Sequence, residues 1–385
     1  MRLAVVTSHP VQYYAPLFRE LQHRLDLQVF YGHRASQQDQ AAAGFGVGFE
    51  WDSDLLSGYS FQFLVNRAKQ PGLGRFGGID TPEIMDRLKE GRFDAVLVIG
   101  WHKKGLLQAL YAAKRLRLPV MVRGDSHLET PRSPVKRLAK QILYPVFLRQ
   151  FDAALAVGQR NHDYWRHYRY PEARIFASPH CVDNDWFAQR ASPAARSALR
   201  SELGIDPAAP VALFAGKLID FKCPQHLLEA AALVRTGGQP LEVLIAGDGL
   251  MKSELAARAA VLGVPLHLLG FCNQSAMPAA YAASDLLVLP SKGETWGLVA
   301  NEALACGRPV IVADSVGCAP DMESSFGPQA TYPFSSISAL ASRINHLLLS
   351  PFNQDRIQAV SHEFSIAKAV DGIMLAVRAN TQMQK

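Results

Sequence analysis

The residues with the clearest chemical potential lie in one stretch of the 385-residue chain, residues 290–310. An apolar run is followed by a short loop that carries Glu294, and a helical pattern begins near Leu298, which places Glu302 in its second turn. The first N–H groups of a helix have no acceptor within the helix and favour a phosphate. Gly297 allows close approach of the backbone at this point. The stretch therefore predicts an anion cradle flanked by two carboxylates.

Two carboxylates beside a phosphate are poor ligands for it, but they are good acceptors for sugar or ribose hydroxyls, because an ionised oxygen accepts a strong hydrogen bond. The alternative is that Glu294 is a loop charge and that Glu302 lies on a solvated helix face, as isolated glutamates mostly do. The pattern of residues around the two glutamates favours the first interpretation.

These side chains need a scaffold, and short apolar runs alternate with longer amphipathic stretches along the whole chain. The expected buried strands are Leu3–Thr7, Leu27–Tyr31, Ala95–Ile99, Val120–Arg123, Ala153–Val157, Val211–Ala215, Leu241–Ala246, Leu266–Leu269, Leu286–Leu289 and Val310–Ala313. Continuous apolar strands separated by helices are typical of parallel sheets covered on both faces. The length also exceeds what one core usually supports, so we expect two doubly wound α/β domains.

The charge is uneven along the chain. Residues 1–190 carry 26 basic and 18 acidic side chains, whereas residues 191–385 carry 14 and 16. The basic half suggests an anionic partner such as a phosphate-bearing substrate, a membrane surface or nucleic acid. No nucleic-acid-binding motif accompanies the charge, so we expect no nucleic-acid partner. The five cysteines are widely spaced and form no CxxC pair, which argues against a disulfide framework or a zinc site.

Residues 290–310 resemble the family 4 retaining glycosyltransferases, in the frame PS-x-x-E-x-x-G-L-x-x-x-E-A-L-A-C-G-x-P-V. Further matching pieces follow in order along the chain: Ser178–Asn184, Phe214–Leu218 with Lys222, Ile245–Gly249, Leu269–Phe271 and Ser284–Ser291. The resemblance implies two Rossmann-like domains facing a cleft (the GT-B fold) and a final helix that crosses back. We accordingly expect an acceptor-binding domain at residues 1–187, a nucleotide-sugar-binding domain at residues 188–363 and the returning helix at residues 364–385.

The resemblance also implies roles on the donor side. Lys217, where the family commonly has arginine, and Lys222 follow the expected strand Val211–Ala215 and Gly216. They would offset the charge of a leaving diphosphate. Glu302 would accept the ribose hydroxyls, and Glu294 would contact the hydroxyls of the donor sugar. The loop residues whose amides would meet the sugar or phosphate are Thr295, Trp296, Gly297 and Leu298.

On the acceptor side, candidate polar residues follow three expected strands. His9 and Gln12 follow the first strand, at the end where ligands approach parallel sheets; His9 serves equally well as a helix cap. His102 follows a second strand and is either functional or packed in the core. Asp125 and His127 follow a third, where many family members carry a histidine near the anomeric carbon. Asp125 is the residue expected to face the reacting carbon, with His102 and His127 as its neighbours. The expected catalytic residues are Glu294, Asp125 and His102.

Two other features have alternative interpretations. Asp52 and Asp54 form an Asp-x-Asp, which holds a metal in another glycosyltransferase architecture, but further oxygen ligands are missing nearby and we expect no metal and no cofactor. Residues 132–149 are basic, with Val135, Leu138, Ile142 and Phe147 near one helical face. This helix could rest on an anionic membrane. Amphipathicity marks any surface helix, so the sequence favours a solvated helix that packs on its own domain.

The sequence as a whole predicts a retaining transferase that moves a sugar from a nucleotide-diphosphate-sugar to a glycan, lipid-linked or small-molecule acceptor, in cell-surface polysaccharide or glycolipid synthesis. The alternatives are a nucleotide-sugar epimerase of the same fold and a non-catalytic nucleotide-sugar-binding protein. The first apolar run is too short for a signal sequence, and no window approaches 18 apolar residues. We therefore expect a cytoplasmic protein or one peripheral on the inner face of the membrane.

Overall fold

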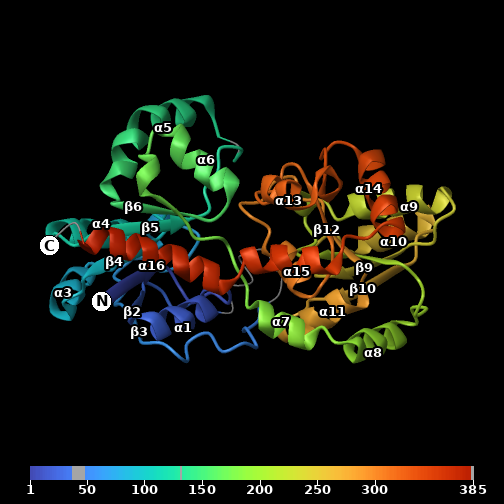
Figure 1. The fold of residues 1–385 in the computed structure, drawn as a ribbon, viewed down its shortest axis with the longest axis horizontal. Coiled ribbons are helices and arrows are strands. Elements are labelled where there is room, and N and C mark those ends of the chain that lie inside the picture. The colour runs from blue at the N-terminus through green and yellow to red at the C-terminus, as the bar shows by residue number, and fades with distance from the viewer. Residues whose placement is uncertain (37–47, 131, 383–385) are drawn as a thin grey trace. The chain divides into compact units, whose positions relative to one another are not determined.

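The protein is represented by a computed structural model, which describes residues 1–36, 48–130 and 132–382. The chain divides into two compact units, each of which is an α/β structure (Figure 1). Among the described residues, the first unit contains those up to His180 together with the C-terminal segment from Ile366. The second unit contains Cys181–Ser365. The two expected doubly wound domains are thus present.

The first unit is built on a seven-stranded parallel sheet in the order β3-β2-β1-β4-β5-β6-β7. Its strands are β1 (Arg2–Thr7), β2 (Asp26–Tyr31), β3 (Phe61–Phe63), β4 (Ala95–Ile99), β5 (Val120–Gly124), β6 (Ala153–Ala156) and β7 (Ile175–Ala177). Its helices are α1 (Tyr14–Arg24), α3 (Ile84–Gly91), α4 (Lys104–Arg115), α5 (Pro134–Phe147), α6 (Gln159–His167) and α16 (Ile366–Gln382). Every residue of β4 is buried, as expected for a central strand that is covered on both faces.

The C-terminal helix α16 packs against α1 and against β6 and β7 of the first unit (Figure 1). The Ser178 hydroxyl donates to the carbonyl of Ala369 across this contact, at 2.9 Å. A Cβ atom at Gly372 would lie 1.7 Å from the carbonyl oxygen of Ala177, so only glycine allows the helix to approach so closely. The expected return of the last helix to the N-terminal domain is confirmed.

The second unit is built on a six-stranded parallel sheet in the order β10-β9-β8-β11-β12-β13. Its strands are β8 (Val211–Ala215), β9 (Glu242–Ala246), β10 (Leu266–Gly270), β11 (Leu286–Leu289), β12 (Val310–Ala313) and β13 (Thr331–Tyr332). Its helices are α7 (Asn184–Arg190), α8 (Pro193–Leu203), α9 (Gln225–Thr236), α10 (Lys252–Leu262), α11 (Met277–Ala283), α12 (Leu298–Ala305), α13 (Ala319–Phe326), α14 (Ile337–Leu349) and α15 (Gln354–Glu363). Strand β8 is buried throughout and lies at the centre of this sheet.

All ten strands expected from apolar runs are present, whereas β3, β7 and β13 were not predicted. Each of these three lies at an edge of its sheet and contains only two or three residues. An edge strand has a partner on one side only and needs no long apolar run, so its sequence carries a weak signal.

The boundary between the units falls after His180, whereas the sequence placed it after residue 187. Residues 181–187 belong to the second unit because Phe187 is buried in its core. Asp183 caps α7 by accepting the N–H of Trp186 at 3.0 Å, and the Asn184 amide donates to the carbonyl of Ser361 at 2.8 Å. Phe364 is also part of the second core. Helix α16 begins at Ile366, two residues after the start that the sequence predicted for the returning helix.

Candidate functional site

Glycines at the carboxyl ends of β8 and β9 let two backbone turns touch. Gly216 has a φ of +148°, and a Cβ atom at Gly247 would lie 1.8 Å from the carbonyl oxygen of Gly216. A Cβ atom at Gly249 would lie 2.6 Å from the carbonyl oxygen of Leu218. The Leu218 N–H also donates to the Asp248 carbonyl at 2.9 Å. This backbone contact fixes the turn that carries Lys217.

Three charged side chains of the second unit converge at this turn. The Lys222 ammonium lies 2.5 Å from Glu294 Oε1, and the Ser291 hydroxyl donates to the same oxygen at 2.5 Å. Burial lowers the pKa of Lys217, and the charge of Lys222 lowers it further while Glu294 opposes the shift. The Lys292 N–H donates to the Phe221 carbonyl at 2.9 Å, which joins the two loops. The two lysines and Glu294 therefore form one cluster.

The loop after β11 leads into the N-terminus of α12 in a conformation that requires glycine. Gly297 has a φ of +105°, and a Cβ atom there would lie 2.6 Å from a methyl group of Leu289. The N–H of Gly317 donates to the Glu294 carbonyl at 3.0 Å, and a Cβ atom at Gly317 would lie 2.1 Å from the Thr295 carbonyl oxygen. No side chain of the described residues caps α12. Its first-turn N–H groups, from Leu298 onward, therefore offer an anion site beside the lysine cluster.

The side chain of Trp296 is buried and packs in the core of the second unit. It is 3% exposed, its indole N–H donates to Asn301 Oδ1 at 2.9 Å, and its ring lies 5.6 Å from that of Phe364. Any contact of Trp296 with a donor is therefore confined to its backbone. No sequence signal assigned a role to Asn301, because it lies within an apolar helical pattern and resembles a core position.

Glu302 on α12 is held by a tyrosine that the sequence analysis missed. The hydroxyl of Tyr281, on α11, donates to Glu302 Oε2 at 2.6 Å, and Tyr281 is fully buried. Burial raises the pKa of Glu302 to about 7, and the hydrogen bond from Tyr281 opposes that rise. A single tyrosine among alanines in a helix is typical of core packing, so no sequence signal identified it as a partner of Glu302.

Donor affinity is expected to depend on pH through Glu302. An ionised carboxylate accepts hydroxyl hydrogen bonds more strongly than a neutral one, and a pKa of about 7 means that raising the pH ionises it. A ligand that prefers the ionised form binds more tightly as the pH rises through that pKa. Between about pH 6 and pH 8 the Kd of a nucleoside diphosphate should fall by up to about tenfold. Calorimetric titration measures the change.

Two variants control this prediction. The phosphates of the ligand also titrate in this pH range and contribute their own change in Kd. Glu302→Gln should abolish the additional change in Kd that comes from Glu302 and leave only the contribution of the phosphates. Tyr281→Phe should move the midpoint to higher pH, because it deletes the hydrogen bond that lowers the pKa of Glu302. A wild-type Kd that follows the same pH profile as the Glu302→Gln variant would contradict a role of Glu302 in binding.

The first unit holds a cavity of about 220 Å³ at the carboxyl ends of β1, β4 and β5. It is lined by Thr7, Ser8, His9, Val11, Tyr13, Tyr14, Ile99, Gly100, Trp101, His102, Arg123, Gly124, Asp125 and Ser126. Three predicted residues, His9, His102 and Asp125, thus share one cavity. Two others do not line it: Gln12 lies in the turn before α1, and His127 is buried, 4% exposed, beyond the end of β5.

Electrostatic interactions connect the residues of this cavity. Burial and the neighbouring Lys103 lower the pKa of His102, and Asp125 opposes that shift. The Ser8 hydroxyl lies 2.9 Å from His9 Nδ1. Arg123 is 1% exposed and donates to the carbonyls of Ser178 and Pro179, at 3.2 and 2.8 Å. Arg123 therefore holds the floor of the cavity in place. The sequence did not indicate this role, because an arginine at the end of an apolar strand can equally be exposed.

The Asp-x-Asp pair lies in a loop of the first unit. The Asp54 carboxylate accepts the N–H groups of Leu56 and Ser57, at 3.0 and 3.1 Å. A hydrogen bond from Ser57 and these backbone N–H groups lower the pKa of Asp54 to about 2. Asp54 therefore closes a turn of its own loop. In the described part of the chain, no group of three or more histidine, cysteine or acidic residues is arranged to hold a metal ion.

The two sheets and the returning helix define a GT-B type of fold, and solved structures with this fold resemble nearly the whole chain. They include Anabaena HepE in complex with UDP and glucose, with a TM-score of 0.70 and 17% identity over 98% of this chain and 100% of that chain. They also include the lipopolysaccharide outer core galactosyltransferase WaaB in its apo form, with a TM-score of 0.69 and 16% identity over 98% and 99% of the two chains. At such identities the likeness concerns the fold.

Similarity to a protein family lies in the second unit. The family model of the glycosyl transferases group 1 matches residues 195–362. A D-inositol 3-phosphate glycosyltransferase of Rhodococcus erythropolis is 41% identical over 137 residues, which cover 33% of this chain and 31% of that relative. The enzyme of the same name from Streptomyces bingchenggensis is 40% identical over 134 residues, 32% of this chain and 29% of that relative. The chain thus matches less than a third of the length of these relatives.

Across residues 1–36, 48–130 and 132–382, no helix combines the length and apolarity that crossing a bilayer requires.

Proposed function

We propose that this chain is a retaining glycosyltransferase that moves a sugar from a nucleotide-diphosphate-sugar to a hydroxyl of a glycan or lipid-linked acceptor. The observation that carries the proposal is the cluster of Lys217, Lys222 and Glu294 beside the N-terminus of α12. Cations and helix N–H groups suit a diphosphate, and a carboxylate among them suits sugar hydroxyls. The match of residues 195–362 to the family model of the glycosyl transferases group 1 supports the same function.

In the proposed reaction the bond between the anomeric carbon and the diphosphate oxygen breaks, and its electron pair stays on the diphosphate. The acceptor oxygen bonds to the anomeric carbon on the same face, and its proton passes to the departing phosphate oxygen. Lys217, Lys222 and the first N–H groups of α12 offset the charge that develops on the diphosphate. Because the lysines supply that positive charge, we propose that transfer requires neither a metal ion nor a cofactor.

The remaining residues have proposed positions along the two substrates. Glu302, held by Tyr281, accepts the ribose hydroxyls, and Glu294 accepts hydroxyls of the donor sugar. The cavity of the first unit holds the acceptor, with Asp125 and His102 as its polar groups. The names of the structural neighbours guide the choice of substrates: HepE was solved with UDP-glucose, and WaaB is a lipopolysaccharide galactosyltransferase. We propose a cytoplasmic protein that meets a lipid-linked acceptor at the inner face of the membrane.

A binding and turnover assay tests the proposal. Nucleoside diphosphates and their sugars should raise the thermal unfolding temperature of the wild-type protein, because a ligand that binds the native state stabilises it by mass action. The nucleotide-sugar that gives the largest shift is then incubated with lipid-linked glycan acceptors and with EDTA present, and product configuration is read by NMR. We expect an acceptor-dependent product with the donor's anomeric configuration.

The assay also separates the alternatives. Conversion of the donor sugar without any acceptor would identify an epimerase. Binding of a nucleotide-sugar without turnover, together with unchanged cellular function of a Glu294→Ala variant, would identify a non-catalytic binding protein. Stabilisation by no nucleoside diphosphate or nucleotide-sugar would overturn the proposed donor site.

A further inference from the structure

Helix α5 of the first unit exposes an apolar stripe that nothing in the described part of the chain covers. Val135, Leu138, Ile142 and Val146 are 78%, 64%, 65% and 68% exposed, and no residue of α5 is buried. Their spacing of three or four residues places them on one face of the helix. The side chains of Leu138 and Ile142 are thus left in water, although burial of such groups is favourable.

The opposite side of α5 attaches the helix to its unit. The ring of Phe147 lies 5.9 Å from that of Phe151 and 6.4 Å from that of Trp101, and the ring of Tyr144 lies 5.2 Å from that of Tyr168. The sequence favoured a solvated helix that packs on its own domain, and it placed Phe147 near the apolar face. The helix does contact its own unit, through Phe147 and Tyr144, whereas the stripe remains exposed.

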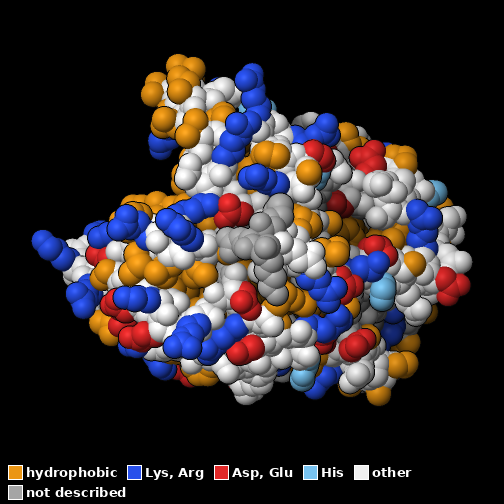
Figure 2. All heavy atoms as spheres, turned by 60° about the vertical axis from the view of Figure 1, so that its left-hand side comes forward, with side chains coloured by type: hydrophobic (Ala, Val, Ile, Leu, Met, Phe, Trp, Pro, Cys, Tyr) orange, Lys and Arg blue, Asp and Glu red, His pale blue; other side chains and the backbone are white. Residues whose placement is uncertain are grey.

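Cations accompany the stripe, and acidic residues are absent from this stretch of sequence. Residues 132–149 contain five basic and no acidic side chains: Arg132, Lys136, Arg137, Lys140 and Arg149. In Figure 2 hydrophobic and basic side chains gather together at the projecting end of the first unit, where α5 lies. An apolar face beside basic side chains, on a helix without carboxylates, is typical of helices that lie in a membrane interface.

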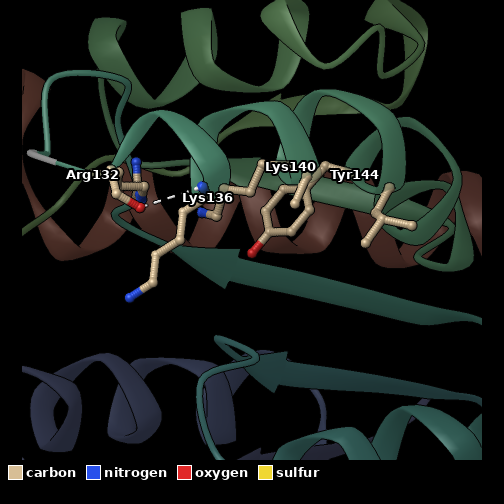
Figure 3. A pocket seen from close by; sticks show the side chains of 7 residues that line it. Arg132, Lys136, Lys140 and Tyr144 are labelled. Carbon is tan, nitrogen blue, oxygen red and sulfur yellow. Dashed lines mark hydrogen bonds between the residues drawn. The ribbon is translucent and has the colours of Figure 1, made fainter.

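Three of these cations surround a pocket of about 460 Å³. Arg132, Lys136 and Lys140 line it together with Tyr144, and they follow one side of α5 in Figure 3. The Lys140 ammonium lies 4.3 Å from the centre of the Tyr144 ring, an arrangement that holds the lysine in place. A recess of this size that is lined by three cations suits a phosphate group.

We propose that α5 docks the protein on an anionic lipid bilayer, with the stripe from Val135 to Val146 inserted among the headgroups and lipid phosphates bound by Arg132, Lys136 and Lys140. The stripe covers about 16 Å along the helix, which suits a helix lying in the membrane plane. A second copy of the chain fits this surface less well, because pairing two α5 faces would bring like charges together. The inference rests on the proposed function in one respect: docking would bring the transferase to an acceptor that is held in the membrane.

The test is a vesicle flotation assay with the full chain and without donor or acceptor, so that it does not depend on catalysis. Vesicles of phosphatidylcholine mixed with phosphatidylglycerol should carry the protein upward, whereas vesicles of phosphatidylcholine alone should carry much less. Each cation near an anionic bilayer contributes about a fivefold factor in partitioning. Binding should weaken as the salt concentration rises from about 0.1 M to about 1 M, since salt screens exposed charges.

Variants locate the contact. The double variant Leu138→Glu/Ile142→Glu should lose most of the binding, and Lys136→Ala/Lys140→Ala should lose more than tenfold on anionic vesicles. The matched control is Leu250→Glu/Val261→Glu, which adds the same two charges at apolar residues of the second unit that are 97% and 86% exposed, and it should bind as the wild type does. Thermal unfolding temperatures of the α5 variants should stay near that of the wild type, because the replaced stripe side chains are exposed.

Three outcomes would overturn the proposal: equal binding to both kinds of vesicle, binding that survives the Leu138→Glu/Ile142→Glu change, or absence of wild-type binding. Light scattering identifies the competing occupant, since a dimer that this double variant dissociates would assign the stripe to a second copy. A chain that binds vesicles but transfers no sugar would leave this inference standing and overturn the proposed function instead.

Discussion

The Lys222→Met variant is expected to lower kcat by about a hundredfold to a thousandfold, the loss measured when one group that stabilises developing charge is removed. Lys222 lies 2.5 Å from Glu294 in the structure, at the place proposed for the donor diphosphate. The substitution keeps most of the side chain's volume and removes its charge. Because that charge acts on the diphosphate as it departs, kcat should fall more than KM rises.

The matched control is Lys114→Met in the first unit. Lys114 also forms a close ion pair, 2.8 Å from Asp152, and its side chain is similarly accessible, 36% against 23% for Lys222. The control should lose a little stability and keep its kcat. A Lys222→Met enzyme that retains its kcat within about threefold would contradict the proposed role of the lysine.

The Lys222→Met/Glu294→Gln pair separates stability from function. Lys222→Met alone leaves the Glu294 carboxylate, 13% exposed, with Ser291 as its hydrogen-bond donor. A partly buried charge that loses its partner is unfavourable, so this variant should unfold at a lower temperature. Adding Glu294→Gln neutralises the carboxylate and should recover part of that stability. Activity should not return, because both the cation and the proposed sugar contact are then missing.

The Gly297→Ala variant is expected to destabilise the second unit by about 1–3 kcal/mol and to weaken nucleoside diphosphate binding at least tenfold. Gly297 has a φ of +105°, and its added Cβ atom would lie 2.6 Å from Leu289 and 3.1 Å from Val316. Leu289 and Val316 are 1% and 0% exposed and have little room to move, so we expect relief of that overlap to move the start of α12. The helix N–H groups proposed to hold the diphosphate would move with it.

The control for Gly297→Ala is Gly263→Ala at the end of α10. Gly263 also has a positive φ, +65°, but a Cβ atom there meets nothing within 4 Å. This control measures the backbone strain alone and should bind nucleoside diphosphates normally. Chemical denaturation and calorimetric titration compare the two variants. Equal stability and equal affinity would show that the packing around Gly297 does not position α12.

Glu294 and Glu302 differ in how much of their surroundings the sequence predicted. Both glutamates were selected from their spacing, and the cluster of Glu294 with Lys222 was expected. The partner of Glu302 was not, because Tyr281 lies on a different helix and resembles a core residue. Hydrogen bonds between elements depend on tertiary placement, which spacing along the chain does not encode.

A similar limit applies to the amphipathic helix α5. The sequence showed that one face was apolar, but either the domain or a lipid surface could have covered that face. Only the structure shows that Phe147 faces the domain and that Leu138 faces solvent. The helical periodicity of a sequence assigns residues to faces, whereas the direction of each face depends on how the helix is attached.

The sequence by itself determined the two parallel sheets, the returning C-terminal helix and the set of charged residues that cluster around the turn after β8. It did so because buried strands need continuous apolar runs and because tight backbone turns need glycine. The tertiary structure alone decided the short edge strands, the domain boundary at His180, the inward position of Trp296 and the exposed stripe of α5. These features depend on contacts between segments far apart in the chain. The sequence allows each side chain several partners, and only the tertiary structure shows which partner it contacts.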